Sequence, residues 1–549
     1  MKKRHTPVLL AALLGAAVAG CGGHAAEETS AGAAVPLYDD LGSWHREIAT
    51  DSERAQAYFD QGLRLQYAFN HAEAIRSYRA ALDLDPECAM CWWGIALAAG
   101  PNINAPMDSA SGALAREAIG RARELAAEGP PGERALIEAL AVRYADDPTA
   151  ERAPLDSAWA RAIGRVAEAR PDDPDVLTLR AAALMNLSPW NYWTGPYDAR
   201  EPRPDTPAIL AAVERVLEIE PDHPGACHYF IHAVEAAYPE RAVPCAERLA
   251  SLMPGAGHIV HMPGHIYIRV GRYHDAVRAN EHAVHADESY IQDQRPGGIY
   301  PGAYYPHNYH FMWFAATMAG MRDKALWAAR QVAPKVPLEL AREVYWIQNV
   351  RVLPRLAMVT FGDWEGVLAE PMPSPDLPVA TVMAHYARGV ARAATGRPEE
   401  ARSELATLRG ILAEMEADQA PEGIRTVSGI AVKVLEGEIA LRSGDPEGAV
   451  PPLREAAALE DGLLYEEPPL WYLPVRHVLG RALLEAGRPA EAEQVYRQDL
   501  VRFPANGWSL VGLTAALEAQ GRRAATAEAR ASFEEAWRHA DIELTSSRI

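Results

Sequence analysis

Hydrophobic positions along the chain recur every three or four residues, and the same block of positions returns many times. In its first copy, Phe69 is followed by Glu73-Ala74 and then by Tyr78, Ala81 and Pro86. This spacing places the apolar residues on one face of a helix. No sustained alternation of apolar and polar residues marks a strand, so we predict an all-α fold. Similar blocks centre on Ala242, Ala276, Ala325, Val367, Ala401, Ala449, Ala492 and Thr526.

The distances between block centres define a repeat. Ala242 to Ala276, Val367 to Ala401 and Ala492 to Thr526 are each 34 residues. Small residues stand where two amphipathic helices of one unit would cross. A single unit cannot bury its apolar face alone, so neighbouring units stack into a solenoid. The block and its period resemble the tetratricopeptide repeat (TPR), which implies an α-solenoid of helix-turn-helix units.

Longer strings extend this resemblance over most of residues 50–535. LDPECAMCWWGIALAAGPNIN, HYFIHAVEAAYPERA and MPGAGHIVHMPGHIYIRVGRY are similar to a family of exported bacterial TPR lipoproteins. That family has no established activity, so the resemblance implies only a fold and a location in the cell envelope.

The pattern divides the chain into six segments. We predict a signal peptide at 1–20, a lipidated cysteine and flexible tether at 21–50, N-terminal repeats at 51–128, degenerate helical repeats at 129–222, repeats with a His-rich groove at 223–340, and C-terminal repeats with a cap at 341–549.

The N-terminus carries the signals that predict the cellular location. A basic start at Lys2–Arg4 precedes an apolar segment at 7–18, which is too short for a stable membrane span. Val-Ala-Gly before Cys21 resembles a lipobox, which implies cleavage there and lipid on the thiol; the alternative is an ordinary cleaved signal. Gly22 favours the outer membrane over the inner one by resemblance to lipoprotein sorting. The lipid would be the only membrane attachment.

Charge and cysteine usage narrow the partners. A net charge of −21 repels phosphate backbones and argues against nucleic acid, so we expect a protein or peptide partner. In an oxidising compartment, Cys88 and Cys91 form a local disulfide, a redox pair or two buried apolar residues. Cys227 and Cys245 fall where two helices of one repeat face each other, which allows a disulfide; otherwise Cys227 is a soft metal ligand.

Histidine is concentrated in one region: residues 223–310 hold eleven of the 18 histidines. Aligned repeats put His258, His261 and His265 at positions 2, 5 and 9 of one first helix, and His307 and His310 at positions 2 and 5 of the next. In TPR structures these positions line the concave groove. We predict that these five imidazoles bind a transition metal, Zn, Cu or Fe, with additional ligands at Cys227, His228, His232 and Glu235.

Two alternatives to a binding groove remain open. In the first, the groove is the site of a metalloenzyme, with a carboxylate such as Glu235 or Glu288 beside the ligands. In the second, it is part of an assembly scaffold in which the histidines are incidental. Pro263 and Gly264 interrupt the helix that carries His258 to His265. We favour a lipid-anchored binding protein of the cell envelope and leave enzymatic activity open.

A second candidate groove lies near the C-terminus. Trp471, Arg476, His477 and Trp508 fall at or beside groove positions of adjacent repeats. They form either a surface for a ligand or peptide, or bulky packing that caps the array.

Two loop regions border the predicted grooves. Trp190, Trp193, Asn102 and Asn104 are expected to close one rim. The insertion at 291–305 is either a lid beside the histidines or a surface loop.

Overall fold

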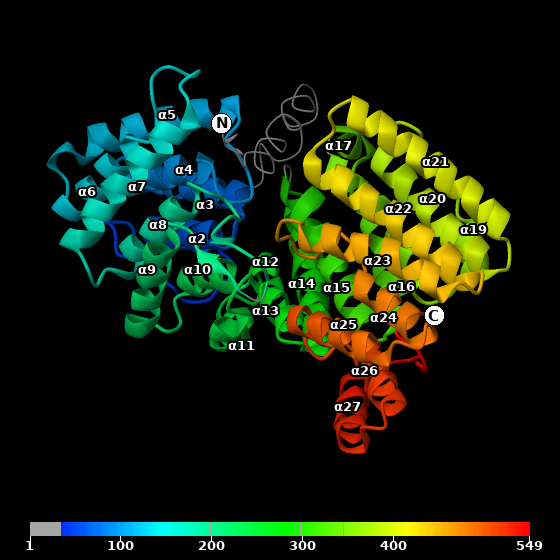
Figure 1. The fold of residues 1–549 in the computed structure, drawn as a ribbon. Helices are drawn as coiled ribbons and strands as arrows, with labels where there is room; N and C mark the ends of the chain where they lie inside the picture. Colours follow the sequence, from blue (N-terminus) through cyan, green and yellow to red (C-terminus); the bar gives the residue numbers. More distant parts are fainter. Residues whose placement is uncertain (1–34, 198, 297–298, 344) are drawn as a thin grey trace, which may run out of the picture. The chain divides into compact units, whose positions relative to one another are not determined.

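A computed structural model describes residues 35–549 except 198, 297, 298 and 344. Within that part the chain is mostly helical (Figure 1), and the strands it contains are one short antiparallel pair, β1 (Trp193–Thr194) and β2 (Glu201–Pro202). The prediction of an all-α fold is confirmed. The predicted signal peptide and Cys21 lie outside the described residues, so the lipid anchor stays a prediction. None of the described helices combines the length and apolarity needed to cross a bilayer.

Contacts group the chain into two units. The first unit contains residues up to Gly195, Ala199–Ile266 and His282–Tyr305; the second contains Pro196–Asp198, Tyr267–Glu281 and Pro306–Ile549. The boundaries of the four predicted repeat segments stay predictions.

The first unit is built from consecutive helices packed as pairs, such as α2 with α3, α4 with α5 and α8 with α9. Its helices are α2 (Glu53–Tyr67), α3 (His71–Leu84), α4 (Ala89–Ala99), α5 (Ser109–Leu125), α6 (Pro131–Ala141), α7 (Arg152–Ala169), α8 (Pro174–Met185), α9 (Thr206–Ile219), α10 (Pro224–Val234), α11 (Val243–Leu252) and α12 (Gly257–His261), with α13 (Pro263–Arg269) and α14 (Tyr273–Gln294) crossing the unit boundary. Single turns occur at Ala126–Glu128, Pro239–Ala242 and Tyr300–Tyr304.

The second unit continues the same pairing, with α20 on α21, α22 on α23 and α26 on α27. Its helices are α15 (Tyr305–Met318), α16 (Arg322–Lys335), α17 (Leu338–Glu343), the 3₁₀ segment Tyr345–Val352, α18 (Leu353–Thr360), α19 (Trp364–Ala369), α20 (Pro378–Ala394), α21 (Pro398–Ala417), α22 (Glu422–Arg442), α23 (Pro446–Asp461), α24 (Val475–Glu485), α25 (Pro489–Arg502), α26 (Gly507–Ala519) and α27 (Arg523–Ala536).

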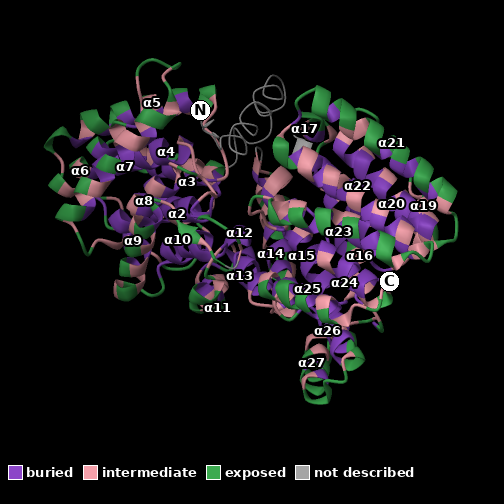
Figure 2. Cartoon of the chain, viewed as in Figure 1, coloured by how far each residue is buried: buried purple, intermediate pink, exposed green. Residues whose placement is uncertain are grey.

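Glycine allows the paired helices to approach. The buried ring of Tyr78 on α3 lies between Gly62 on α2 and Gly94 on α4, where an added Cβ would come within 2.5 and 2.6 Å of the ring. The second unit repeats the arrangement at Gly480, Tyr496 and Gly512. The predicted small residues at helix crossings are therefore present, and each aromatic ring links one helix pair to the next. Figure 2 shows the result, with buried residues gathered where helices face one another.

The first described residues are not a free tether. The Tyr38 N–H donates to Gln61 Oε1 at 2.8 Å, and the Trp44 Nε1–H donates to Asp175 at 3.0 Å. Leu41 and Ile48 are buried. We therefore correct the predicted tether at 21–50: residues 35–50 pack on the first unit.

Both candidate cysteine pairs are disulfides in the structure. Cys88 bonds to Cys91 at the start of α4, and Cys227 on α10 bonds to Cys245 on α11. The second bond uses the sulfur of Cys227, so Cys227 is not available as a thiolate ligand, and we withdraw it from the predicted ligand set.

The crossing geometry makes a stability prediction. Gly62→Ala forces a methyl group against the Tyr78 ring and should lower the free energy of unfolding by about 1–3 kcal/mol. Gly164→Ala on α7, which meets no atom within 4 Å, is the matched control and should be neutral or stabilising by about 0.5–1 kcal/mol. Urea unfolding followed by circular dichroism measures both. Equal effects of the two substitutions would contradict the account.

Candidate metal centre

Five histidines of the first unit form a closed ring of imidazoles, which we call the histidine ring. His228 and His232 come from α10, His258 and His261 from α12, and His265 from α13. Going round the ring, neighbouring centroids are 4.9 Å (His228 to His232), 5.3 Å (His232 to His265), 4.8 Å (His265 to His261), 5.8 Å (His261 to His258) and 4.9 Å (His258 to His228) apart. No member is more than 3% exposed.

Local sequence explains how three short helices supply this ring. Every residue of α10 is buried, so its two histidines, one turn apart, face the interior. The helix carrying the other three breaks at Met262, because Pro263 cannot continue the backbone hydrogen bonds. The predicted interruption is confirmed, and it separates His265 from His258 and His261 at the site itself.

Glu235 fixes the orientation of two of the rings. It has no exposed surface, and its two oxygens accept from His232 Nδ1 at 3.0 Å and from His265 Nδ1 at 2.7 Å. Burial raises the pKa of this carboxyl group, but the electrostatic attraction of His265 and the hydrogen bonds from the Nδ1–H groups of both imidazoles outweigh it and hold the pKa below 4.5. Glu235 is therefore a carboxylate, and both Nδ1 atoms carry protons.

The resulting proton assignment leaves two lone pairs facing each other. His228 Nδ1 lies 2.6 Å from the carbonyl oxygen of Tyr67 and must donate to it. In neutral His228 and His232 the Nε2 atoms then carry no proton, yet they lie 3.1 Å apart. Burial lowers the pKa of both residues, which disfavours a shared proton. A bound cation relieves this repulsion without protonating either ring.

His258 is the third donor beside this pair. Neither of its ring nitrogens has a hydrogen-bond partner among the described residues, although the side chain is 3% exposed. Burial also lowers the pKa of His258 well below its ordinary 6.5. One of its ring nitrogens lies within 4.8 Å of ligand atoms of His228 and His232. A buried imidazole without a partner costs stability, and a metal ion would supply the partner.

His261 and His265 form a second facing pair. Their Nε2 atoms are 2.9 Å apart. Here His261 can carry its proton on Nε2 and donate to His265, so this pair does not require a cation. It offers a second position for one.

The spacing of both pairs suits coordination. Two nitrogens bound at about 2.1 Å to one ion lie roughly 3.0–3.4 Å apart, depending on the coordination angle. The ring as a whole is wider: a pentagon with sides of about 5 Å places its centre about 4 Å from each centroid, compared with about 3.2 Å in a coordinated imidazole. One ion would therefore use a subset of the ring. Neutral imidazoles suit Zn, Cu, Fe or Ni.

Phe69 covers one side of the histidine ring. Its ring centroid lies 4.4 Å from that of His228 and 5.5 Å from that of His258. Phe69 adopts φ 56° at the helix-turn position where Gly487 stands in a later repeat with φ 73°. A bulky residue in this left-handed region is strained, and such strain is concentrated at functional sites. The replacement of glycine by phenylalanine in the repeat block was the sequence signal for this residue, which our sequence analysis missed.

Loop residues complete the walls. The ring centroid of Trp190 lies 4.7 Å from that of His232, and the centroid of Tyr304 lies 4.7 Å from that of His258. Asn104 Nδ2 donates to the Tyr304 hydroxyl at 3.0 Å, and Trp193 Nε1 donates to the carbonyl of Ala233 at 2.7 Å. The predicted rim loop and the 291–305 insertion therefore both contribute residues to the histidine ring's surroundings.

His307 and His310 lie on α15 in the second unit, with centroids 6.4 Å apart. Burial lowers the pKa of His310 to about 4. Their participation in the metal centre stays a prediction.

The C-terminal groove residues are mostly buried. Trp471, His477 and Trp508 are at most 2% exposed. His477 Nε2 contacts Asp499 at 3.0 Å, and Trp508 Nε1 donates to the carbonyl of Thr317 at 2.9 Å. Arg476 forms two hydrogen bonds to Asp461. Three of the four side chains are therefore buried and the fourth is paired with a carboxylate, and their role as a ligand surface stays a prediction.

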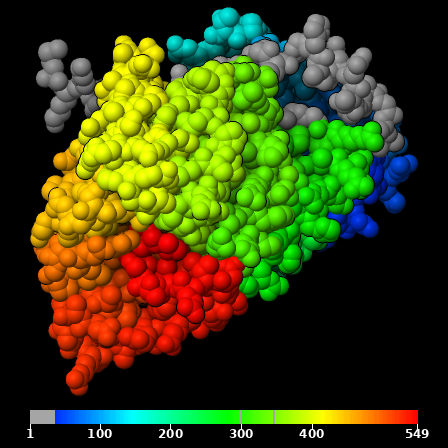
Figure 3. Space-filling view, turned by 90° about the vertical axis from the view of Figure 1, so that its right-hand side faces the viewer, coloured from blue at the N-terminus to red at the C-terminus, as the bar shows by residue number. Residues whose placement is uncertain are grey.

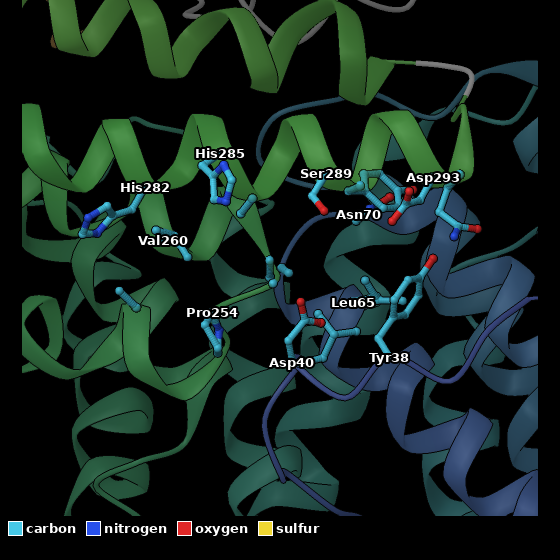
Figure 4. Close-up of a pocket in the computed structure, with 18 of the residues that line it drawn as sticks. Tyr38, Asp40, Leu65, Asn70, Pro254, Val260, His282, His285, Ser289 and Asp293 are labelled. Atoms are coloured by element: carbon cyan, nitrogen blue, oxygen red, sulfur yellow. The ribbon is translucent and has the colours of Figure 1, made fainter.

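A pocket of about 420 Å³ lies next to the histidine ring. Figure 4 shows Tyr38 and Asp40 on one side of it and His285 and Ser289 of α14 on the other. Tyr300 also lines the pocket, and its hydroxyl accepts from the His258 backbone N–H at 3.2 Å. The pocket wall and the histidine ring therefore share α12.

Comparison with known proteins adds little about function. No family model matches the chain, and no curated protein sequence matches it. Among solved structures it is similar to human IFIT1 as a dimer with m7Gppp-AAAA (13% identity, 90% of this chain and 92% of that chain, TM-score 0.32). It is also similar to yeast Tom70 (10%, 86% and 90%, 0.29) and to Cut9 of the APC/C Cut9-Hcn1 hetero-tetramer (12%, 90% and 76%, 0.27). Likeness at this level carries no argument about activity.

The buried imidazoles make a prediction about stability and pH. Because burial lowers the pKa of His228, His232 and His258 below 6.5, the unfolded chain binds more protons than the folded one below that pH. The metal-free protein should therefore lose stability as the pH falls from about 7 to 5. His258→Leu replaces an unpartnered polar group by an apolar one and should raise metal-free stability by about 1–3 kcal/mol while weakening the pH dependence.

Denaturant unfolding at pH 5, 6 and 7 in the presence of a chelator measures both effects. A loss of stability in His258→Leu at pH 7 would indicate that His258 is a hydrogen-bonded structural residue, against the account.

Proposed function

We propose that the first unit binds a divalent transition metal ion in the histidine ring. Its ligands are Nε2 of His228, Nε2 of His232 and a ring nitrogen of His258. The observation that carries the proposal is the pair of facing Nε2 atoms at 3.1 Å, with both Nδ1 atoms committed to other acceptors.

The surroundings support coordination by neutral imidazoles. Tyr67 and Glu235 accept the Nδ1 protons and so direct the Nε2 lone pairs inward, as outer-sphere carboxylates and carbonyls do at histidine-ligated metals. The disulfides of Cys88, Cys91, Cys227 and Cys245 leave no free thiolate among the described residues. The donor set therefore favours Zn²⁺, Cu²⁺ or Fe²⁺ over metals that prefer sulfur or oxygen ligands.

We also propose that the chain acts in the cell envelope, exported and attached to the outer membrane through lipid on Cys21. The basic start, the short apolar segment and the small residues before Cys21 support this address. Two disulfides in the described part of the chain suit an oxidising compartment.

Metal content tests the proposal directly. Protein exported to a periplasm and purified without a His tag or chelator should contain at least one equivalent of metal per chain by mass spectrometry. The double variant His228→Ala with His232→Ala should retain less than a tenth of it, because both Nε2 ligands are lost.

The matched control is His282→Ala with His285→Ala, which removes two exposed imidazoles of α14 and should keep the metal. The proposal fails if the wild-type protein stays metal-free after incubation with Zn²⁺, Cu²⁺ or Fe²⁺, or if both double variants lose metal equally.

Glu235→Gln tests the orienting carboxylate. The amide oxygen can accept from only one Nδ1–H, so the hold on His232 is weakened. Where the NH₂ group faces His232 it must donate to Nδ1, which moves the proton of that ring to Nε2 and blocks a ligand position. Metal affinity should fall about 10–100-fold, measured by competition with a chromophoric chelator. Glu404→Gln is the control, since Glu404 accepts from His385 Nδ1 at 2.6 Å in the second unit. Unchanged affinity in Glu235→Gln, with the fold intact, would refute the role of Glu235.

A further inference from the structure

Residues 544–549, which we call the tail, lie without helical structure against the second unit. Leu544, Ser547 and Arg548 are 8%, 1% and 3% exposed. The hydrogen-bond partners of Ser547 and Arg548 come from α18, α22, α24 and α25, which are up to 189 residues away in sequence. In the space-filling view the red end of the chain borders the yellow and yellow-green surface of this unit (Figure 3).

The side chain of Arg548 binds the buried carboxylate of Glu438. Its Nε donates to Glu438 Oε1 at 2.7 Å, and its Nη1 donates to the carbonyl of Val359 at 3.3 Å. Glu438 has no exposed surface. Burial raises the pKa of Glu438, but Arg548 and Arg442 outweigh it and lower the pKa to about 2. The carboxylate is therefore charged and matched to a guanidinium.

The backbone and small side chains of the tail are held as well. Arg442 Nη2 donates to the backbone oxygen of Ile549 at 2.7 Å, and Arg481 Nη1 donates to the carbonyl oxygen of Arg548 at 3.1 Å. The Ser547 hydroxyl donates to the carbonyl of His477 at 2.7 Å and lies 2.7 Å from the Tyr496 hydroxyl. Arg442 and Arg481 therefore bind backbone oxygens of the tail, and Glu438 binds the side chain of Arg548.

The residues of α18, α22, α24 and α25 that hold the tail form what we call the tail groove. This groove keeps its own charge balance without the tail. Glu438 Oε2 accepts from Arg442 Nε at 2.8 Å, and the Arg442 guanidinium lies 5.1 Å from the centroid of the Trp364 ring. Tyr386 and Tyr472 hydrogen-bond to each other at 3.0 Å. Departure of the tail would therefore leave no buried charge unpaired, which is the usual obstacle to removing one partner of a buried ion pair.

We propose that this groove is a recognition site for an extended peptide in which an arginine precedes an aliphatic residue, and that the tail occupies it in competition with such a partner. The Glu438 carboxylate selects the arginine, and Arg442 and Arg481 fix the peptide carbonyls. The tail also accounts for part of the burial around His477, which the sequence placed at a groove position. This site is independent of the histidine ring.

Binding of a peptide in trans tests the proposal. The probe is a fluorescein-labelled peptide with the sequence Asp541–Ile549, measured by anisotropy against full-length protein. Arg548→Ala weakens the internal occupant and should bind the probe at least tenfold more tightly than wild-type protein. A chain lacking residues 542–549 should bind it at least as well.

Two controls separate recognition from a structural role. A probe with alanine in place of its arginine, and the variant Arg548→Ala with Glu438→Gln, should each reduce binding at least tenfold. Binding of both probes with equal affinity would overturn the proposal. A lowered melting temperature of Arg548→Ala without detectable probe binding would also overturn it, because the tail would then only stabilise the fold. This outcome decides the question even if the truncated chain does not fold.

Discussion

The arrangement of the histidine ring depends on a single buried carboxylate. Glu235 has no contact with solvent, and it accepts an N–H from an imidazole of α10 and another from an imidazole of α13. Because a carboxylate can only accept, it decides which nitrogen of each ring carries the proton. Both remaining nitrogens must then point away from Glu235, toward the other histidines.

The repeat architecture brings these groups together at some cost in folding stability. Tyrosine rings seated between glycines set the approach of neighbouring helices, and the disulfide between Cys227 and Cys245 ties α10 to α11 beside His228. Phe69 takes a left-handed backbone where a repeat of this kind prefers glycine. A fold that only needed to stack its helices would have no reason to keep that strain or an unpartnered histidine at position 258.

The sequence predicted the parts of this account that follow from periodicity. The 34-residue spacing, the small residues at helix crossings, the interruption at Pro263 and the position of His258, His261 and His265 on one helix face could all be derived from residue types. The one-turn spacing of His228 and His232 predicted them as additional ligands, but the direct contact between their Nε2 atoms could not be derived, because it depends on α10 being buried on all sides. Whether Trp471 and Trp508 line an open surface or pack inside the array could not be decided from the sequence, since a groove position says nothing about which other segment of the chain fills the groove.

Anomalous diffraction from crystals of the metal-loaded protein, recorded above and below the absorption edge, tests the central claim most directly. The account predicts a peak about 2.0–2.2 Å from Nε2 of both His228 and His232, with a nitrogen of His258 completing the set. A structure at high occupancy of added metal in which the only peaks lie at surface residues, with the two Nε2 atoms still in direct contact, would contradict it.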